Sequence, residues 1–92
     1  MSVHHDPVGH RFTERVPSGT AVLAYSPAGD GVLELYSTFV PSADRGKGVA
    51  AGLVEAAVAY ARQERLRILP SCWYVAQWLQ EHPEHADLLA ET

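Results

Sequence analysis

The sequence is poor in cysteine, in positive charge and in long apolar runs, and each shortage excludes a class of protein. Cys72 is the single cysteine among 92 residues, so the chain cannot close an internal disulfide or build a zinc site from several thiolates. Lys and Arg total 7 against 11 Asp and Glu, which argues against a protein that coats nucleic acid or an anionic membrane. A run of about 18 apolar residues is absent, and the first residues lack the basic and then apolar layout of a secretory signal.

These shortages lead to expectations about class and location. We expect a cytoplasmic protein with neither nucleic acid nor a membrane as its partner, in which any anionic ligand is held by a local site. Hydrophobic residues make up 47% of the chain, an ordinary share for a globular protein, and the length suffices for one core. The sequence therefore predicts a single domain over residues 1–92, with residues 1–9 flexible. Nothing in it indicates an oligomeric state.

Proline and glycine divide the front half of the chain into three predicted strands. The strands cover residues 10–16, 20–26 and 32–40, and turns at residues 16–19 and 27–31 separate them, so antiparallel pairing through hairpins is expected. Period-two alternation in the third strand puts one set of side chains on a common face: Leu33, Leu35, Ser37 and Phe39. Ser37 interrupts that apolar face. A serine bonded to a neighbouring carbonyl explains it, and a catalytic role for Ser37 is the second interpretation.

The back half is predicted to contain two helices and one strand. From Gly48 to Glu64 apolar residues recur at spacings of three and four and alanine is abundant, which predicts a long helix. Residues 66–69 form a short apolar run that Pro70 ends, and we interpret this run as a fourth strand. A second helix is predicted from Trp73 to His82, before a last short turn through Leu89.

The order strand, loop, helix, strand between residues 32 and 69 predicts a βαβ unit with parallel strands. The fold class is therefore α/β in the broad sense, an α+β fold in which antiparallel strands lead into this unit. Because the carboxyl ends of parallel strands share one sheet edge, the loop that follows Val40 and the thiol of Cys72 should lie at the same edge, where ligands of open sheets bind.

The loop from Pro41 to Ala50 has the composition of a phosphate-binding loop. Gly46 and Gly48 lack a Cβ atom, so a phosphate can approach the backbone, and Arg45 and Lys47 supply positive charge. The spacing fits neither the dinucleotide-binding fingerprint nor a Walker A loop. A flexible turn with solvated cations is the ordinary interpretation of such a segment, but the strand before it and the helix after it favour phosphate binding.

The loop and several further segments of the sequence resemble those of a known family. The run from Arg45 to Ala50 is similar to the R-x-x-G-x-A form of the acyl-CoA pyrophosphate motif of the GCN5-related N-acetyltransferases. Further segments resemble the small acetyltransferase-like subfamily of the YjdJ and NATD1 kind, and the match spans most of residues 12–89. These segments are Thr38–Pro41, Leu53–Val54, Tyr60–Arg62, Ile68–Cys72 and His82–Glu84.

The resemblance implies a reduced acetyltransferase fold whose splayed parallel strands hold acetyl-CoA, followed by a C-terminal helix. It implies a cofactor site made of Phe39, Val40, Arg45, Gly46, Lys47, Gly48, Val49 and Ala50, with the backbone amides of residues 46–50 on the pyrophosphate. The thioester would lie near the third strand and Cys72. One departure matters: many members have His-Thr where this chain has Ser37-Thr38, so a histidine that could serve as a base is missing.

The implied function is an N-acetyltransferase that moves an acetyl group from acetyl-CoA to an amine, either a small molecule or a protein lysine. Transfer could be direct, or Cys72 could take the acetyl group first, and a third interpretation makes Cys72 a buried, inert side chain. The alternatives are a non-catalytic acyl-CoA binding or regulatory module, and a thiol-dependent enzyme unrelated to CoA. His82 and His85 have metal-ligand spacing but no visible third ligand, so we expect no metal site.

Overall fold

The computed structural model describes residues 3–90 and contains one mixed sheet with two α-helices. The strands are β1 (His4–Asp6), β2 (Arg11–Val16), β3 (Gly19–Gly29), β4 (Val32–Phe39) and β5 (Arg67–Pro70). The helices are α1 (Val49–Glu64) and α2 (Trp73–Gln80), and two 3-10 turns, η1 (Ser42–Asp44) and η2 (Pro83–Leu88), complete the described chain. The predicted elements from residue 10 onward are confirmed to within a few residues at each end.

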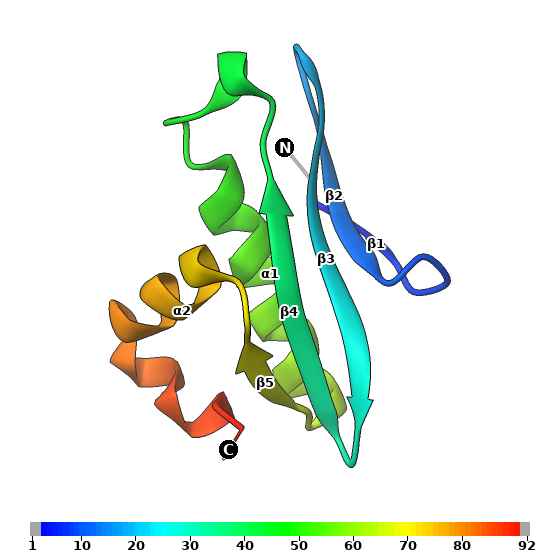
Figure 1. The fold of residues 1–92 in the computed structure, drawn as a ribbon, viewed down its shortest axis with the longest axis vertical. Helices are drawn as coiled ribbons and strands as arrows, with labels where there is room; N and C mark the ends of the chain where they lie inside the picture. The colour runs from blue at the N-terminus through cyan, green and yellow to red at the C-terminus, as the bar shows by residue number, and fades with distance from the viewer. Residues whose placement is uncertain (1–2, 91–92) are drawn as a thin grey trace.

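The sheet has five strands in the order β1-β2-β3-β4-β5. Neighbours are antiparallel from β1 to β4, whereas β4 and β5 are parallel with α1 connecting them. Figure 1 shows α1 lying across one face of the sheet and α2 beside the β4–β5 side. The α+β architecture that the sequence predicts, antiparallel strands leading into a βαβ unit, is therefore confirmed.

The core lies between α1 and the sheet. The apolar residues of α1 recur every three or four positions, and those that face the sheet are buried: Val49, Leu53, Val54, Ala57, Val58 and Ala61. They meet side chains such as Phe12, Leu23 and Ile68, which are at most 2% exposed. Burial of this stripe stabilises α1 more than its helix propensity does, and it fixes the position of the helix N-terminus relative to β4.

Strand β1 lies in the segment for which the sequence predicts flexibility. Residues 1 and 2 of that segment lie outside the described range. His5 connects β1 to the neighbouring strands, since its Nε2 atom lies 2.6 Å from the Tyr25 hydroxyl and its ring stacks on Phe12 at 4.3 Å between centroids. The ring of Tyr60 on α1 meets the same imidazole edge-on at 4.4 Å. A half-buried histidine packed against aromatic rings has no periodic signal in a strand of three residues, so the sequence pattern does not reveal it.

A bulge in β4 changes which side chains face α1. Leu35 pairs with Tyr25 and Ser37 pairs with Ala24, so Tyr36 is an extra residue on the β4 side. Because side chains alternate along a strand, one extra residue exchanges the two faces beyond it. The predicted alternation is therefore wrong after Leu35: Phe39 is 52% exposed and Ser37 is exposed as well.

Strand β4 is paired with β5 over only part of its length. The parallel ladder runs from Val32↔Arg67 to Leu35↔Pro70, and the Cys72 N–H then donates to the Leu35 carbonyl oxygen at 3.0 Å. Beyond this point β4 continues to Phe39, while the chain after β5 turns into α2 (Figure 1). The strands therefore splay, and the end of β4 has a free edge beside the N-terminus of α1.

Candidate functional site

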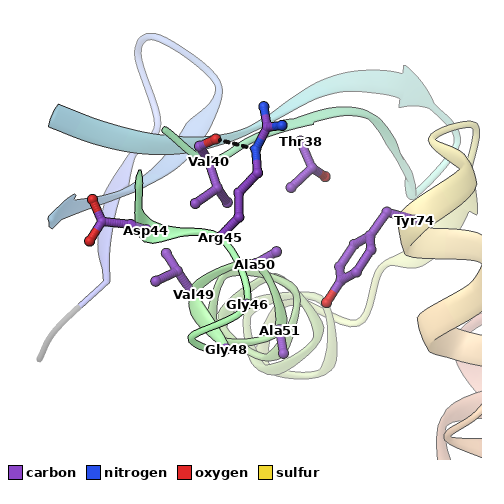
Figure 2. Close-up of a pocket in the computed structure, with 10 residues that line it drawn as sticks. All are labelled: Thr38, Val40, Asp44, Arg45, Gly46, Gly48, Val49, Ala50, Ala51 and Tyr74. Atoms are coloured by element: carbon purple, nitrogen blue, oxygen red, sulfur yellow. Dashed lines mark hydrogen bonds between the residues drawn. The ribbon is translucent and has the colours of Figure 1, made fainter. Parts of the chain in front are cut away.

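A cavity of about 380 Å³ lies where the end of β4, the loop after it, α1 and α2 meet. Its lining is Thr38, Val40, Asp44, Arg45, Gly46, Gly48, Val49, Ala50, Ala51 and Tyr74 (Figure 2). All of the predicted cofactor-binding residues except Phe39 and Lys47 line it, whereas Cys72 and Ser37 do not. The topology thus brings most of the predicted residues together, and it adds Thr38, Asp44, Ala51 and Tyr74, which the sequence analysis did not assign to the site.

The loop enters α1 through two glycines in the left-handed region. Gly46 and Gly48 both have φ 81°, which a side chain would strain, and Gly48 is the N-cap of α1. No side chain caps this helix end, and a Cβ atom at either glycine would meet nothing within 4 Å. The first backbone N–H groups of α1 and the positive end of its dipole are therefore accessible to an anion.

The two cations of the loop are held differently. Arg45 donates from Nε to the Val40 carbonyl oxygen at 3.0 Å, which places its side chain along the cavity (Figure 2). Lys47 instead donates from Nζ to Asp44 Oδ1 at 3.3 Å and does not line the cavity. Of the two charges that the sequence predicts for phosphate binding, the Arg45 guanidinium is the one at the cavity wall.

Asp44 is a buried carboxylate that ties the loop to a distant turn. It is 2% exposed, and it accepts hydrogen bonds from the Ser18 hydroxyl and from the Ser18 N–H at 3.1 Å, in addition to the Lys47 contact. The Ser18 hydroxyl, more than any other group, holds the pKa of Asp44 below its usual value. Ser18 precedes Asp44 by 26 residues, so no local pattern could have revealed this pair.

Cys72 lies beside the site, at the point where the two parallel strands separate. Its Sγ atom is 3.5 Å from Thr38 Oγ1, the side chain that the bulge turns inward. Burial raises the pKa of the Cys72 thiol, but hydrogen bonds from Thr38 and from the backbone N–H groups of Val75 and Tyr74 outweigh it, so the net pKa is lowered. The thiol is half-buried, and its thiolate has the donors that stabilise negative charge.

Tyr74 forms the α2 wall of the cavity. Figure 2 shows its ring directed from α2 toward α1, with the hydroxyl at the cavity. Burial, followed by the negative charges of Glu81 and Glu55, raises the pKa of this phenol. The phenol is therefore protonated at neutral pH. The spacing of apolar residues in α2 does not distinguish an aromatic that lines a cavity from one in the core.

The remaining candidates pack within the fold. The Trp78 ring stacks on His82 at 3.7 Å and on His85 at 5.9 Å between centroids, and His85 Nδ1 lies 3.1 Å from Arg62 Nη2. Among residues 3–90, no group of three or more His, Cys, Asp or Glu side chains is arranged to hold a metal ion. Within the same range, neither helix has the length and apolar character needed to cross a membrane.

Comparison with known proteins gives consistent matches over nearly the whole chain. The family model described as GCN5-related N-acetyltransferase matches residues 11–88. Protein NATD1 of Bos taurus is 37% identical over 85 residues, which cover 90% of this chain and 75% of the relative. Protein NATD1 of Homo sapiens is 36% identical over 85 residues, with 90% and 75% covered.

The fold also matches a solved structure. The solution structure of a GCN5-like protein from Staphylococcus aureus superimposes with a TM-score of 0.76 at 20% sequence identity. The alignment covers 99% of this chain and 89% of that protein. At this identity the likeness concerns the arrangement of strands and helices.

Proposed function

Because this chain belongs to the GCN5-related N-acetyltransferase family, we propose that it binds acetyl-CoA and transfers the acetyl group to an amine acceptor. One observation carries the proposal: the uncapped N-terminus of α1, reached through two left-handed glycines, opens into the same cavity as the free end of β4. This combination offers an anion site and an extended hydrogen-bonding edge side by side.

The binding half of the proposal assigns a role to each wall of the cavity. The backbone N–H groups of residues 46–50 hold the pyrophosphate, and Arg45 adds a guanidinium at the rim. Backbone groups of Phe39 and Val40, beyond the last rung of the β4–β5 ladder, pair with the pantetheine amides. Ala51 and Tyr74 form the apolar wall along the same path. Phe39 takes part through its backbone alone, because its side chain faces away from α1.

In direct transfer, the acceptor nitrogen attacks the thioester carbonyl carbon, so a C–N bond forms and the C–S bond breaks. Acetyl-CoA supplies the activated acyl group and the thiolate leaving group. Backbone N–H groups near Phe39 and Val40 stabilise the developing oxyanion. The Tyr74 hydroxyl, which lines the cavity, donates a proton to the departing sulfur and regains one from solvent. Water takes the proton that the amine loses, because Asp44, the one carboxylate in the lining, is already bonded to Ser18 and Lys47.

In the covalent alternative, the Cys72 thiolate attacks the thioester first and forms an acetyl-cysteine, and the amine then attacks that intermediate. The lowered pKa of Cys72 and its contact with Thr38 favour a reactive thiol at this position. A Cys72→Ser variant distinguishes the routes: direct transfer retains acetylation of the acceptor, and the covalent route loses it. Mass spectrometry of the wild-type protein after mixing with acetyl-CoA detects the acetyl adduct on Cys72.

A second candidate function is a non-catalytic acyl-CoA binder that acts through a partner. The observation in its favour is the cavity lining, which contains no histidine and no unpaired carboxylate that could serve as a base. Release of free CoA thiol is followed with a panel of primary amines and a lysine-containing peptide. Acetyl-CoA binding without release of CoA, and without an adduct on Cys72, favours this second function.

The test of the binding half is calorimetric titration with acetyl-CoA, with ADP as the weaker control ligand. Gly48→Glu should abolish binding, because it places a carboxylate at the pyrophosphate site. Gly48→Ala is the matched control, since an alanine at φ 81° costs about 1 kcal/mol of backbone strain without the charge. Equal affinities for Gly48→Glu and Gly48→Ala would mean that the loop is not the anion site.

A further inference from the structure

Asp44 is a buried carboxylate next to the loop that is proposed to bind the pyrophosphate, and the proposed function does not explain it. Asp44 lines the cavity, yet its side chain points away from Tyr74 and toward the β2–β3 turn (Figure 2). There it accepts from both the N–H and the hydroxyl of Ser18. A carboxylate near an anion site weakens anion binding by Coulomb repulsion. Its presence there indicates a role that offsets this repulsion.

We propose that Asp44 is a positioning residue for the acetyl-CoA loop, and that it acts by fixing this loop to Ser18 in the β2–β3 turn. The inference rests on the proposed function, because it concerns the affinity of the same site. If Asp44 acts in this way, the turn at residues 17–19 determines acetyl-CoA affinity although it does not line the cavity.

The conformational freedom of the loop is the physical reason. Between η1 and α1 the chain passes through Gly46 and Gly48, which reach more backbone conformations than any other residue. If the loop samples other conformations, the affinity falls in proportion to the fraction of molecules in which its N–H groups converge. Asp44 restrains the loop at its start, and the packing of Val49 in the core restrains it at its end.

The charge of Asp44 is largely compensated within the tie itself. Lys47 Nζ lies 3.3 Å from Asp44 Oδ1, and the two Ser18 donors approach the other oxygen. The pair Asp44–Lys47 has no net charge, so its field at the pyrophosphate site is small compared with that of an isolated carboxylate. We therefore expect the loss of positioning to exceed the gain from removing a negative charge when Asp44 is substituted.

The experiment is a set of acetyl-CoA titrations on wild type, Ser18→Ala, Asp44→Asn and the double variant, at a temperature where each is folded. Asp44→Asn should weaken binding about tenfold, the scale of a lost charge-assisted hydrogen bond, and Ser18→Ala should weaken it several-fold. The double variant should weaken binding by less than the product of the two single effects, because both changes act on the same tie. Ser18→Thr retains a hydroxyl and should restore affinity.

Asp30→Asn is the matched control for net charge. Asp30 lies in the β3–β4 turn at φ 54°, a conformation that asparagine also adopts, and its substitution should leave acetyl-CoA affinity unchanged. Hydrogen exchange of the amides of residues 45–51 provides a second readout, which should be faster in Asp44→Asn than in Asp30→Asn.

The outcomes separate this inference from the proposed function. Failure of the wild type to bind acetyl-CoA overturns the proposed function and the inference together. Wild-type binding with equal or tighter binding by Asp44→Asn overturns the positioning role alone. A lower melting temperature without any change in affinity likewise overturns it, because Asp44 would then serve stability only.

Discussion

Thr38 lies beside Cys72 because of one extra residue in β4. Without the bulge at Tyr36, strict alternation from Leu35 would point Thr38 away from α1 and would put Ser37 toward it. The bulge reverses this, so the hydroxyl that meets the thiol belongs to Thr38, while Ser37 is exposed. The sequence position of the missing histidine thus corresponds to an outward-facing site in this fold.

This arrangement makes the thiol titration of Cys72 depend on Thr38. Thr38→Val removes the hydroxyl at nearly constant volume. The pKa of the thiol should then rise, because one of the hydrogen bonds that offset the effect of burial is lost. The rate of alkylation by iodoacetamide follows the thiolate fraction, and its midpoint should therefore move to higher pH in the variant. Mass spectrometry of the labelled protein as a function of pH measures this midpoint.

Cys72→Ser is a complete control for that measurement, because the chain has no other cysteine to label. Ser37→Ala is the matched control, since this neighbouring hydroxyl is exposed on the opposite face of β4. An unchanged midpoint in Thr38→Val would show that the backbone N–H groups of Val75, Tyr74 and Thr38 lower the pKa without the Thr38 hydroxyl.

Residues of the site were predictable where the signal is local. The glycines and the start of α1 follow from a motif of six residues, and they line the cavity as expected. The role of Asp44 was not predictable, because its carboxylate meets a turn formed much earlier in the chain. Which aromatic near the start of α2 lines the cavity depends on the orientation of that helix, and the structure places Tyr74 there.

Among the elements, segments with a periodic pattern or with proline and glycine at their ends were predicted well, whereas the β4 bulge and the strand β1 were not. The 16 residues of α1 carry enough apolar repeats to define both the helix and its buried face. The bulge in β4 and the strand β1 leave no such trace, because each depends on a few cross-strand contacts rather than on a repeated pattern. The splay of β4 and β5 was expected from the family resemblance and is a consequence of the short ladder.

Strand β1 depends on His5, and this dependence leads to a prediction about pH. Burial lowers the pKa of His5, so the unfolded chain binds a proton more readily than the folded chain. The stabilisation that neutral His5 provides is fully present above the pKa of histidine in the unfolded chain, near 6.5. It is lost as the pH falls from there through the lower pKa of His5 in the folded chain. His5→Phe, which keeps a ring against Phe12, should flatten the pH dependence of the free energy of unfolding between about pH 7.5 and 5.

Urea denaturation followed by circular dichroism at several pH values measures this slope. His4→Gln is the control, because His4 is an exposed neighbour on the same strand and lacks the contacts to Phe12 and Tyr60. If His5→Phe retains the wild-type slope and His4→Gln does not, then another histidine dominates the acid response and the burial of His5 contributes little.

At the scale of the whole molecule, α1 joins two regions with different tasks. Its N-terminus forms the cavity, and its C-terminal turn carries Arg62, whose guanidinium makes two hydrogen bonds to Asp87 at 3.0 and 2.9 Å. A helix of 16 residues is about 24 Å long, so the two regions share no side-chain contact. Arg62 also donates to the Glu84 carbonyl oxygen, which attaches η2 to the helix. This end supports the packing of the C-terminal turn rather than the cavity.

The separation predicts that stability and cofactor affinity can be changed independently. Arg62→Gln should lower the melting temperature slightly, because the pair with Asp87 is exposed and bidentate, and should leave the acetyl-CoA dissociation constant within about twofold of wild type. Acetyl-CoA at 100 times its dissociation constant should add about 2.7 kcal/mol to the stability of wild type and of Arg62→Gln alike. In a domain of this size that corresponds to a rise on the order of 10 °C in Tm.

Differential scanning fluorimetry over a series of acetyl-CoA concentrations measures both effects in one experiment. Gly48→Glu should start from a lower Tm and show no increase with ligand, whereas Arg62→Gln should show the full increase from its own baseline. If Arg62→Gln reduced the ligand-dependent increase, the two ends of α1 would be coupled, because the helix would then transmit a change over its full length. Equal increases in wild type and Arg62→Gln would show that acetyl-CoA affinity does not depend on the contacts at the C-terminal end of α1.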